Sequence, residues 1–356
     1  MIEARREFEI TTSVPETAFA SDVPLVAAKR GNHVETVHRG TIAVCTPDGR
    51  VIVGAGDVEQ RTYPRSSAKP FQAMALITTG AAESLGLSER DIAIACASHG
   101  GEPEHVEAVQ GLLANAGLAP DRLRCGIHAP MDAAAARRLS EAGVAPTVLH
   151  NNCSGKHAGM LAACKVMGWP LDSYLELSHP LQQLNLETVA AFCGLESGQI
   201  DLGTDGCGVP TFYLPIRGIA TAFARLATGQ GVSNELAEAA RRIREAMMAH
   251  PFLIAGTRRF DTELMSATSG RIVSKGGAQG CQGIGLVSEG IGLGMKISDG
   301  SSVPVGMAAV LVLKSVANLN DNAWSALDRY ERADLKNHAG TVVGSLEPVF
   351  SIHGPA

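Results

Sequence analysis

Segments with strand character occur near both ends of this 356-residue chain, separated by a long middle region with helical patterns. Near the N-terminal end, TIAVCTPDGRVIVGAGD has two β-rich runs joined across Pro47, Asp48 and Gly49, and the glycine favours a tight turn because it tolerates positive φ. Near the C-terminal end lie three glycine-containing β-type runs and an apolar helical run: RIVSKGG, GIGLVS, GIGLGMKIS and VPVGMAAVLVLKSVANL. The pattern predicts an α/β fold of the α+β type, in which one antiparallel sheet is formed from both chain ends and packed with helices.

The middle region is predicted to be mostly helical. Pro103 and Gly117 are typical boundary residues of one helix, and Ser233 and Pro251 bracket another in the same way. Helices are predicted over about 103–117, 154–168, 181–193 and 234–249. We therefore expect a loose arm over 1–22 and a single unit over 23–356, with a sheet region at about 23–100 and 255–356 and a mixed, mostly helical region at about 101–254.

Charge and composition exclude several classes of protein. The chain has 30 basic and 36 acidic residues and no Lys/Arg cluster long enough to neutralise a row of phosphates, so no nucleic-acid partner is expected. It has no uncharged run of about 18 residues, so no membrane span is predicted, and its first residues lack the apolar core of a secretory signal. These features predict a cytoplasmic protein. Its 8 scattered cysteines are then expected to be reduced thiols, most of them buried.

Ser66 and Lys69 form the sharpest pair of chemically useful side chains. Ser66 or Ser67 can cap a helix with Pro70 in its first turn, and the i, i+3 spacing would then place hydroxyl and amine on one face. A neutral lysine can take the proton of a nucleophilic serine, but the reference lysine pKa of about 10.4 has to fall by several units. The motif equally fits a helix cap beside a solvated lysine. The catalytic interpretation needs a second cation that lowers the pKa of Lys69.

Lys275 is the candidate for that second cation. It lies in SKGG (274–277), a β-type run whose glycines would let a ligand approach the backbone. The segment is similar to the Lys-Thr-Gly strand of serine penicillin-recognising enzymes. Ser98, in a glycine-rich turn, could relay a proton, although an ordinary turn serine fits as well. Arg65 offers a planar fork for a carboxylate, with a surface arginine as the alternative.

Two glycine-containing stretches, HNNCSGKHAGM and TDGCGVP, carry potential metal ligands. Cys153 and Lys156 are spaced i, i+3 in the first stretch, and Cys207 lies in the second. Two thiolates and a neutral amine could bind a soft cation such as zinc. A competing interpretation makes Cys153 a nucleophile with His157 as its base. The residues alone leave both interpretations open.

Eight stretches, taken together and in order, resemble the rhizobial-type L-asparaginase family, which is separate from the threonine-dependent bacterial type and the self-cleaving plant type. They are HRG (38–40), PRSSAKPFQ (64–72), ASHGGEPEHV (97–106), CGIHAPMD (125–132), HNNCSGKHAGML (150–161), DGCGVP (205–210), GTRRFDTELM (256–265) and SKGGAQGCQG (274–283). The resemblance implies a fold and site like those of serine β-lactamases and glutaminases. It also implies hydrolysis of L-asparagine to L-aspartate and ammonia by a homodimer.

The resemblance further implies roles for individual residues. The implied catalytic pairs are Ser66 with Lys69 and Ser98 with Lys275, the implied zinc ligands are Cys153, Lys156 and Cys207, and the implied substrate-pocket residues are Arg65, His157, Asp205 and Gly276. The zinc ion would lie close to the active site, and no organic cofactor is implied. Gln279 departs from the family pattern, in which a glutamate is expected, and the N-terminal arm has no counterpart.

Three alternatives stay open at this point. A glutaminase would act on a side chain longer by one methylene, which changes binding by only about 1–3 kcal/mol. A penicillin-binding or β-lactamase-like enzyme would share the Ser-x-x-Lys and KGG segments, although the chain has no clear Ser-x-Asn motif. A non-enzymatic zinc- or thiol-sensing protein could be built around Cys153 and Cys207.

Overall fold

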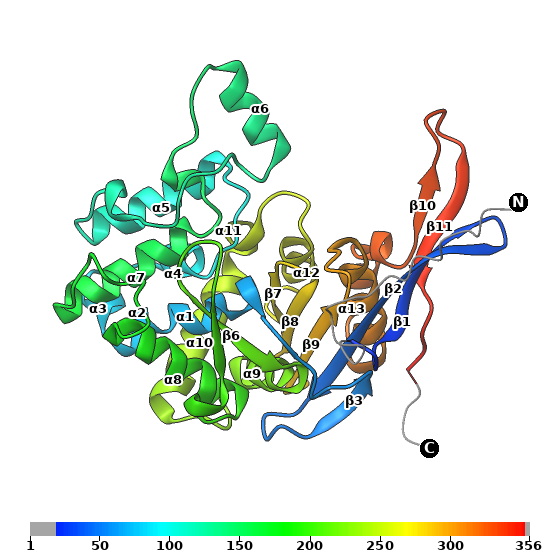
Figure 1. Cartoon of the computed structure of the whole chain (residues 1–356), viewed down its shortest axis with the longest axis horizontal. Helices are drawn as coiled ribbons and strands as arrows, with labels where there is room; N and C mark the ends of the chain where they lie inside the picture. Colours follow the sequence, from blue (N-terminus) through cyan, green and yellow to red (C-terminus); the bar gives the residue numbers. More distant parts are fainter. Residues whose placement is uncertain (1–18, 353–356) are drawn as a thin grey trace, which may run out of the picture.

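The computed structural model describes residues 19–352 and has a central antiparallel sheet to which both ends of the chain contribute (Figure 1). Within these residues the sheet has eight strands in the order β10-β11-β1-β2-β9-β8-β7, with β3 paired to β2 beside this path. The strands are β1 Val23–Arg30, β2 His33–Cys45, β3 Val51–Ala55, β7 Ile272–Gly277, β8 Cys281–Leu286, β9 Ile291–Ile297, β10 Ala333–Lys336 and β11 Val342–Pro348. All their pairings are antiparallel, so the predicted sheet is confirmed.

The predicted arm over 1–22 falls mostly outside the described residues, which begin at residue 19. The part that is described makes a turn into β1 and is anchored to the sheet. Asp22 is buried, and its carboxylate accepts a hydrogen bond of 2.7 Å from Thr41 Oγ1 in β2. It also accepts one from Ser298 Oγ, just after β9.

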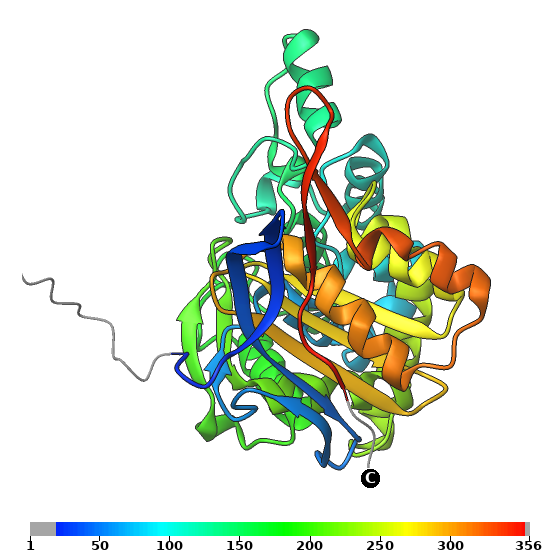
Figure 2. The same ribbon diagram turned by 90° about the vertical axis from the view of Figure 1, so that its right-hand side faces the viewer.

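Helices cover both faces of the sheet. Helix α9 packs against β2, β8 and β9 on one face, and α13 packs against β1, β9 and β11 on the other (Figure 2). The α-helices are α1 Lys69–Ala73, α2 Ala75–Thr78, α3 Ala81–Ser84, α4 Glu89–Ala95, α5 Pro103–Asn115, α6 Ala133–Glu141, α7 Ser154–Met167, α8 Pro180–Cys193, α9 Ile216–Thr228, α10 Asn234–Ala249, α11 Pro251–Ala255, α12 Phe260–Thr268, α13 Val303–Val316 and α14 Asp321–Ser325. Short 3₁₀ turns lie at η1 Arg65–Ala68, η2 Pro120–Arg122, η3 Val148–His150, η4 Ser197–Gln199 and η5 Asp328–Tyr330.

The helices predicted in the middle region are all present, but this region also contains strands. Strands β5 (Asp201–Thr204) and β6 (Pro210–Pro215) form a small sheet with β4 (Arg61–Thr62), in the order β4-β6-β5. This sheet joins the middle region to the segment just before Ser66. The region predicted to be mixed and mostly helical therefore contributes directly to the surroundings of that serine.

A patch of glycines lets α9 lie very close to the sheet. Gly283 pairs with Gly294, and Gly285 pairs with Gly292, across β8 and β9. A Cβ on Gly292 would lie 2.2 Å from Ala220 O, in the backbone of α9. Because side chains alternate along a strand, the residues between these glycines point to the opposite face and pack there in the core beneath α13.

The sheet separates two hydrophobic cores. One cluster fills the space between the α9 face and the helical region, and the other lies under α13. The cysteines are all buried and free of disulfides within the described part of the chain, as the sequence predicts for reduced thiols. No helix in residues 19–352 is long and apolar enough to cross a membrane.

Candidate active site

A cavity of about 590 Å³ brings together residues that lie far apart in the sequence. Its wall includes both predicted serines, the predicted second lysine and one predicted substrate-pocket glycine: Ser66, Ser98, Lys275 and Gly276. Lys69 and Arg65 are not among the residues that line it. The cavity therefore joins η1, the turn after α4 and the end of β7 in one place.

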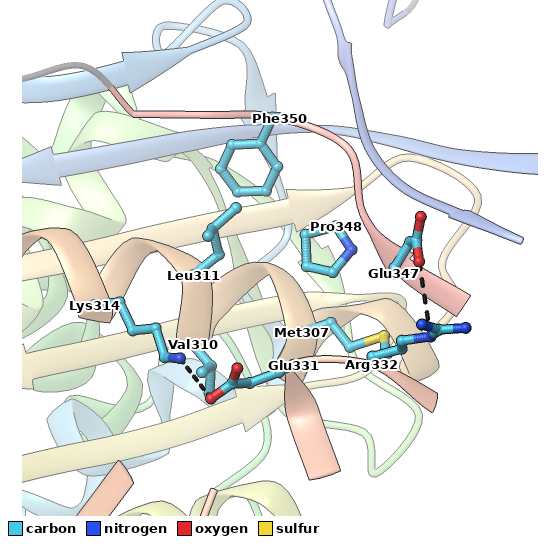
Figure 3. Close-up of a pocket in the computed structure, with 9 residues that line it drawn as sticks. All are labelled: Met307, Val310, Leu311, Lys314, Glu331, Arg332, Glu347, Pro348 and Phe350. Atoms are coloured by element: carbon cyan, nitrogen blue, oxygen red, sulfur yellow. Dashed lines mark hydrogen bonds and ion pairs between the residues drawn. The ribbon is translucent and has the colours of Figure 1, made fainter. Parts of the chain in front are cut away.

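A second cavity, of about 330 Å³, lies between α13 and the end of β11 (Figure 3). Its wall is largely apolar, and Lys314 and Arg332 each form an ion pair there with a glutamate. It holds no serine, cysteine or histidine. The first cavity is therefore the candidate site for chemistry on a substrate.

The backbone around Ser66 differs from the predicted capped helix. Residues 65–68 form a 3₁₀ turn without a side-chain cap, and Lys69 is the first residue of α1. Arg65 has φ +53°, a left-handed conformation that a non-glycine residue rarely adopts. Strain of this kind persists only where the surroundings impose it, and it often occurs at functional sites.

Gly277 explains how β7 reaches this turn. A Cβ on Gly277 would lie 2.1 Å from Pro64 O, so only glycine allows the two backbones to approach so closely. The sequence prediction was that the glycines of this run admit a ligand. At Gly277 it is the backbone of Pro64, and not a ligand, that approaches the glycine. This contact brings Lys275 beside the Ser66 turn.

Ser66 and Ser98 are linked by a chain of hydrogen bonds. Ser98 Oγ donates to Ser66 Oγ over 3.2 Å and accepts from Asn152 Nδ2 over 3.1 Å. The backbone N–H of Ser98 is fixed by Ile254 O at 2.8 Å. Because Ser66 Oγ is the acceptor in this chain, its own proton is left free to be transferred to a base.

Lys69 is fully buried, and carbonyl oxygens hold its amine. Lys69 Nζ donates to Ala97 O over 2.7 Å and to Asn152 O over 3.0 Å. Within residues 19–352 no hydrogen bond joins Lys69 Nζ to Ser66 Oγ. A neutral amine has two N–H groups, both of which these carbonyls would occupy, and its lone pair would remain available as a proton acceptor. Catalytic hydrogen bonds often tighten only once substrate is bound.

Lys275 is also fully buried, and its proton affinity is reduced. Burial lowers the pKa of Lys275 to about 8, against the raising effect of Asp261, and Lys69 and Arg259 lower it further. Its Nζ donates to Gly276 O over 2.8 Å and lies 3.9 Å from Asp261 Oδ2. Lys275 can therefore exist in either protonation state within an ordinary pH range.

Arg65 and Asp205 form an ion pair beside the nucleophile. Arg65 Nε and Nη2 lie 2.8 and 2.7 Å from Asp205 Oδ1. Burial alone would raise the pKa of Asp205, but Lys156 and Arg65 lower it below its ordinary value. Both predicted substrate-binding charges are thus present and ionised, and each is currently paired with the other.

Cys153, Lys156 and Cys207 converge next to this ion pair. Lys156 Nζ donates to Cys207 Sγ over 3.1 Å. A hydrogen bond from Cys207, together with Lys69 and Lys156, holds the pKa of Cys153 well below its usual range despite burial, and the same bond raises that of Cys207. Burial alone would lower the pKa of Lys156, but the two sulfurs and Asp205 raise it.

These donors can be compared with the needs of a metal ion. No group of three or more His, Cys, Asp or Glu side chains in residues 19–352 is arranged to hold a metal. The cluster therefore offers two sulfurs and depends on Lys156 as its third ligand. Loss of one thiol proton and one ammonium proton would convert it into two thiolates and an amine, a donor set that zinc accepts with a fourth position open.

His157 lies deeper than a pocket residue. Its ring is fully buried, and Nδ1 is 2.7 Å from the hydroxyl of Tyr174. Burial, together with Lys156 and Lys69, lowers the pKa of His157 well below its ordinary value, so the ring is neutral. Its side chain makes no hydrogen bond to Cys153 in the described residues.

Residues 152 and 261 are parts of the site that the sequence did not single out. Asn152 holds Ser98 through its side chain and Lys69 through its carbonyl, and Asp261 lies beside Lys275 in the cavity wall. Both fall inside stretches that carry the family resemblance. The sequence signal that could have identified Asn152 and Asp261 is that each is a polar residue in such a stretch and has no other assigned role.

Gln279, for which the resemblance implies a glutamate, also lies in the cavity wall. It has φ +61°, and its backbone carbonyl accepts a hydrogen bond from Lys296 Nζ. A neutral side chain therefore lies in the same cavity wall as Lys275.

Comparison with known proteins gives the following matches. Crystal structures of a protein called Mglu are similar to this chain: one has 17% identity and a TM-score of 0.36 over 80% of this chain and 69% of that chain. A second, of Mglu in its glutamate form, has 17% identity and a TM-score of 0.36 over 79% of this chain and 62% of that chain. No curated protein matches the sequence. The model of the family described as L-asparaginase II matches residues 26–348, most of the chain, and the chain therefore belongs to this family of amidohydrolases.

Proposed function

We propose that this amidohydrolase converts L-asparagine and water into L-aspartate and ammonia through an ester on Ser66. The observation that carries the proposal is the cavity in which Ser66 and Ser98 are 3.2 Å apart, in a wall shared with Lys275. A serine needs an adjacent base and a proton donor to cleave an amide. Two buried lysines at this cavity supply one amine for each task.

In the first step, Ser66 Oγ attacks the carbon of the side-chain amide and its proton passes to neutral Lys69. Backbone N–H groups, including that of Ser66, would stabilise the oxyanion. The C–N bond then breaks as the leaving nitrogen takes a proton from Ser98, which takes one from the ammonium of Lys275. Ammonia leaves, and a β-aspartyl ester remains on Ser66.

In the second step, water attacks the ester carbonyl while a lysine amine takes its proton. The Ser66–carbon bond breaks, Ser66 regains its proton and L-aspartate leaves. Arg65 would bind the α-carboxylate and Asp205 the α-ammonium, so a zwitterion would exchange their mutual ion pair for two new ones. Gly276 would form part of the wall, and neutral His157 would support it from behind. Fixing the small substrate at both charges would orient its amide towards Ser66.

Glutamine is the second candidate substrate. Clefts of about 300–1,000 Å³ bury most of a drug-sized ligand, so the cavity of about 590 Å³ has room for one more methylene than asparagine has. Ammonia release from asparagine, glutamine and β-aspartyl hydroxamate, measured side by side, would rank the substrates. Absence of turnover with all three would refute the proposed amidase activity. Nitrocefin hydrolysis would reveal a β-lactamase-like activity instead.

The pH dependence of the reaction is expected to report Lys275. Only its ammonium form can supply the proton for ammonia, and its pKa is about 8. We expect kcat/KM for asparagine to fall as the pH rises through this value. In a Lys275→Arg variant kcat/KM should be lower and this limb absent, because arginine stays protonated up to about pH 12. An unchanged limb in the variant would show that another group causes it.

We also propose that Cys153, Lys156 and Cys207 hold a zinc ion. When bound, the ion would supply positive charge beside Arg65 and Asp205 and fix the position of that end of the substrate pocket. The protein purified without chelators is expected to contain about one zinc per chain, as in three-ligand sites. A Cys153→Ala, Cys207→Ala double variant should lose it, as measured by elemental analysis. Cys281→Ala is the matched control, since this buried thiol lies outside the cluster, and unchanged zinc in the double variant would exclude these ligands.

The family resemblance further leads us to propose a cytoplasmic homodimer. Exposed valines on two strands of the sheet, β2 and β11, offer apolar surface for such contact: Val34, Val37 and Val342. Large exposed apolar residues that gather on one surface are typical of protein–protein contacts.

A further inference from the structure

We propose that Asp261 is a positioning residue of the candidate site, anchoring the end of β7 and serving as the buried counter-charge of Lys275. Asp261 is the second residue of α12 and is 6% exposed. It lies in the GTRRFDTELM stretch, to which the proposed mechanism gives no task. The inference deepens the proposed function and rests on it for its catalytic consequence, but the contacts of Asp261 stand by themselves.

Both carboxylate oxygens of Asp261 accept hydrogen bonds from the sheet. Oδ1 accepts from Ser274 Oγ over 2.7 Å and from Gln282 Nε2 over 2.9 Å. Oδ2 accepts from the backbone N–H of Gly276 over 2.7 Å. These donors lie on either side of Lys275 in β7 and on the neighbouring strand β8. The carboxylate therefore fixes the backbone from which the Lys275 side chain extends.

The same Oδ2 atom is 3.9 Å from Lys275 Nζ. Both groups are buried, with side-chain exposures of 1% for the lysine and 8% for the aspartate. Opposite charges at this distance favour each other's ionised forms, and more strongly where water is excluded. Asp261 is thus placed to keep a proton on a lysine that burial would otherwise neutralise.

Other charged groups act on Lys275 from different elements. Lys69 in α1 and Arg259, just before α12, disfavour its ammonium form, whereas Asp261 and Cys153 favour it. Arg259 is exposed and lines the cavity. Its side chain has no hydrogen bond or ion pair in the described residues. Asp261 and Arg259 therefore act on the same amine with opposite sign, one from a buried position and one from the rim.

This balance matters for the proposed proton donor. Lys275 has to be charged to protonate the leaving ammonia, and without a counter-charge it would be largely neutral at physiological pH. Asp261 would extend the pH range in which Lys275 carries the proton that it donates. Because it acts through Lys275, it need not touch the substrate.

The direct test is the titration of Lys275 by NMR in protein labelled with ¹³Cε-lysine, with the Lys275→Arg variant to assign the signal. We expect Asp261→Asn to lower the midpoint by about one unit, the lower end of the effect of a near opposite charge. Arg259→Gln should raise it. An unchanged or raised midpoint in Asp261→Asn, or a shift in the same direction in both variants, would overturn the proposal. Arg259→Gln alters only an exposed side chain, so it tests the charge balance even if Asp261→Asn does not fold.

Ser274→Ala is the matched control for a purely structural effect. It removes one hydrogen bond to Asp261 Oδ1 but leaves the charge in place, so the Lys275 midpoint should stay at the wild-type value. A shift equal to that of Asp261→Asn would mean that the hydrogen bonds, and not the charge, determine the titration, and the counter-charge role would be rejected.

The pH profile of ammonia release provides the second readout. Its descending limb should move to lower pH in Asp261→Asn and to higher pH in Arg259→Gln, in parallel with the NMR midpoints. If the midpoints move as expected while the wild type releases no ammonia from asparagine or glutamine, the role of Asp261 is supported and the proposed function fails. If ammonia is released but neither midpoint moves, the proposed function stands and this inference fails.

Discussion

Replacing Ser66 by alanine is expected to lower kcat for ammonia release from asparagine by about 10⁴-fold or more, because removal of a covalent nucleophile eliminates the acyl-enzyme route. Alanine fits the 3₁₀ turn, and within residues 19–352 the serine side chain makes only one hydrogen bond, to Ser98. The fold should therefore survive. The measurement is steady-state ammonia release with circular dichroism as the check on folding.

Cys153→Ala separates the serine route from the rival thiol route. If Ser66 is the nucleophile, the cysteine variant retains the acyl-enzyme route, although its turnover is reduced if zinc is needed to hold the substrate. The acyl-enzyme itself can be trapped by acid quench and located by mass spectrometry on the peptide that contains Ser66. Turnover retained in Ser66→Ala and abolished only in Cys153→Ala would show that the Cys153 thiol, and not Ser66, is the nucleophile.

The sheet could be predicted from sequence because its central strands have clear local signals. The β2–β3 turn has Gly49 at φ +87°, and β7, β8 and β9 are separated by turns that contain glycine. Strands β1, β10 and β11 were not predicted individually. They are half exposed, and β1 pairs with β11 from the opposite end of the chain. Such pairings depend on tertiary contacts that a local pattern does not contain.

The candidate site was likewise predictable where local motifs exist and not where tertiary contacts decide. Serine and lysine motifs in the correct chain order indicated Ser66, Ser98 and Lys275, and these residues line one cavity. The local geometry differed: a 3₁₀ turn replaces the capped helix, and it follows Pro64, whose carbonyl closely approaches Gly277, 213 positions along the chain. Asn152 and Asp261 act through contacts with other elements, Asn152 with Ser98 and Asp261 with Lys275. Neither contact could be anticipated from spacing, since each depends on how two different elements pack together.

The glycine patch under α9 leads to the largest expected effect on stability. A Cβ on Gly292 would lie 2.2 Å from both Ala220 O and Ala224 N. These are backbone atoms inside a helix, so they cannot move aside as a flexible side chain can. Overpacking a well-packed core costs about 1–3 kcal/mol, and occasionally more. We expect Gly292→Ala to lower the free energy of unfolding by about 3 kcal/mol or more, as measured by urea denaturation followed by circular dichroism.

Gly111→Ala is the matched control because it makes the same chemical change in open space. Gly111 lies within α5, and a Cβ there would have no neighbour within 4 Å. Alanine is a better helix former than glycine by about 0.8–1.0 kcal/mol, so this variant should be slightly more stable than the wild type. The two substitutions are thus expected to have opposite signs. Equal stability of Gly292→Ala and the wild type would mean that α9 can move away from the sheet, and the close packing of helix on glycine would not be what holds the two layers together.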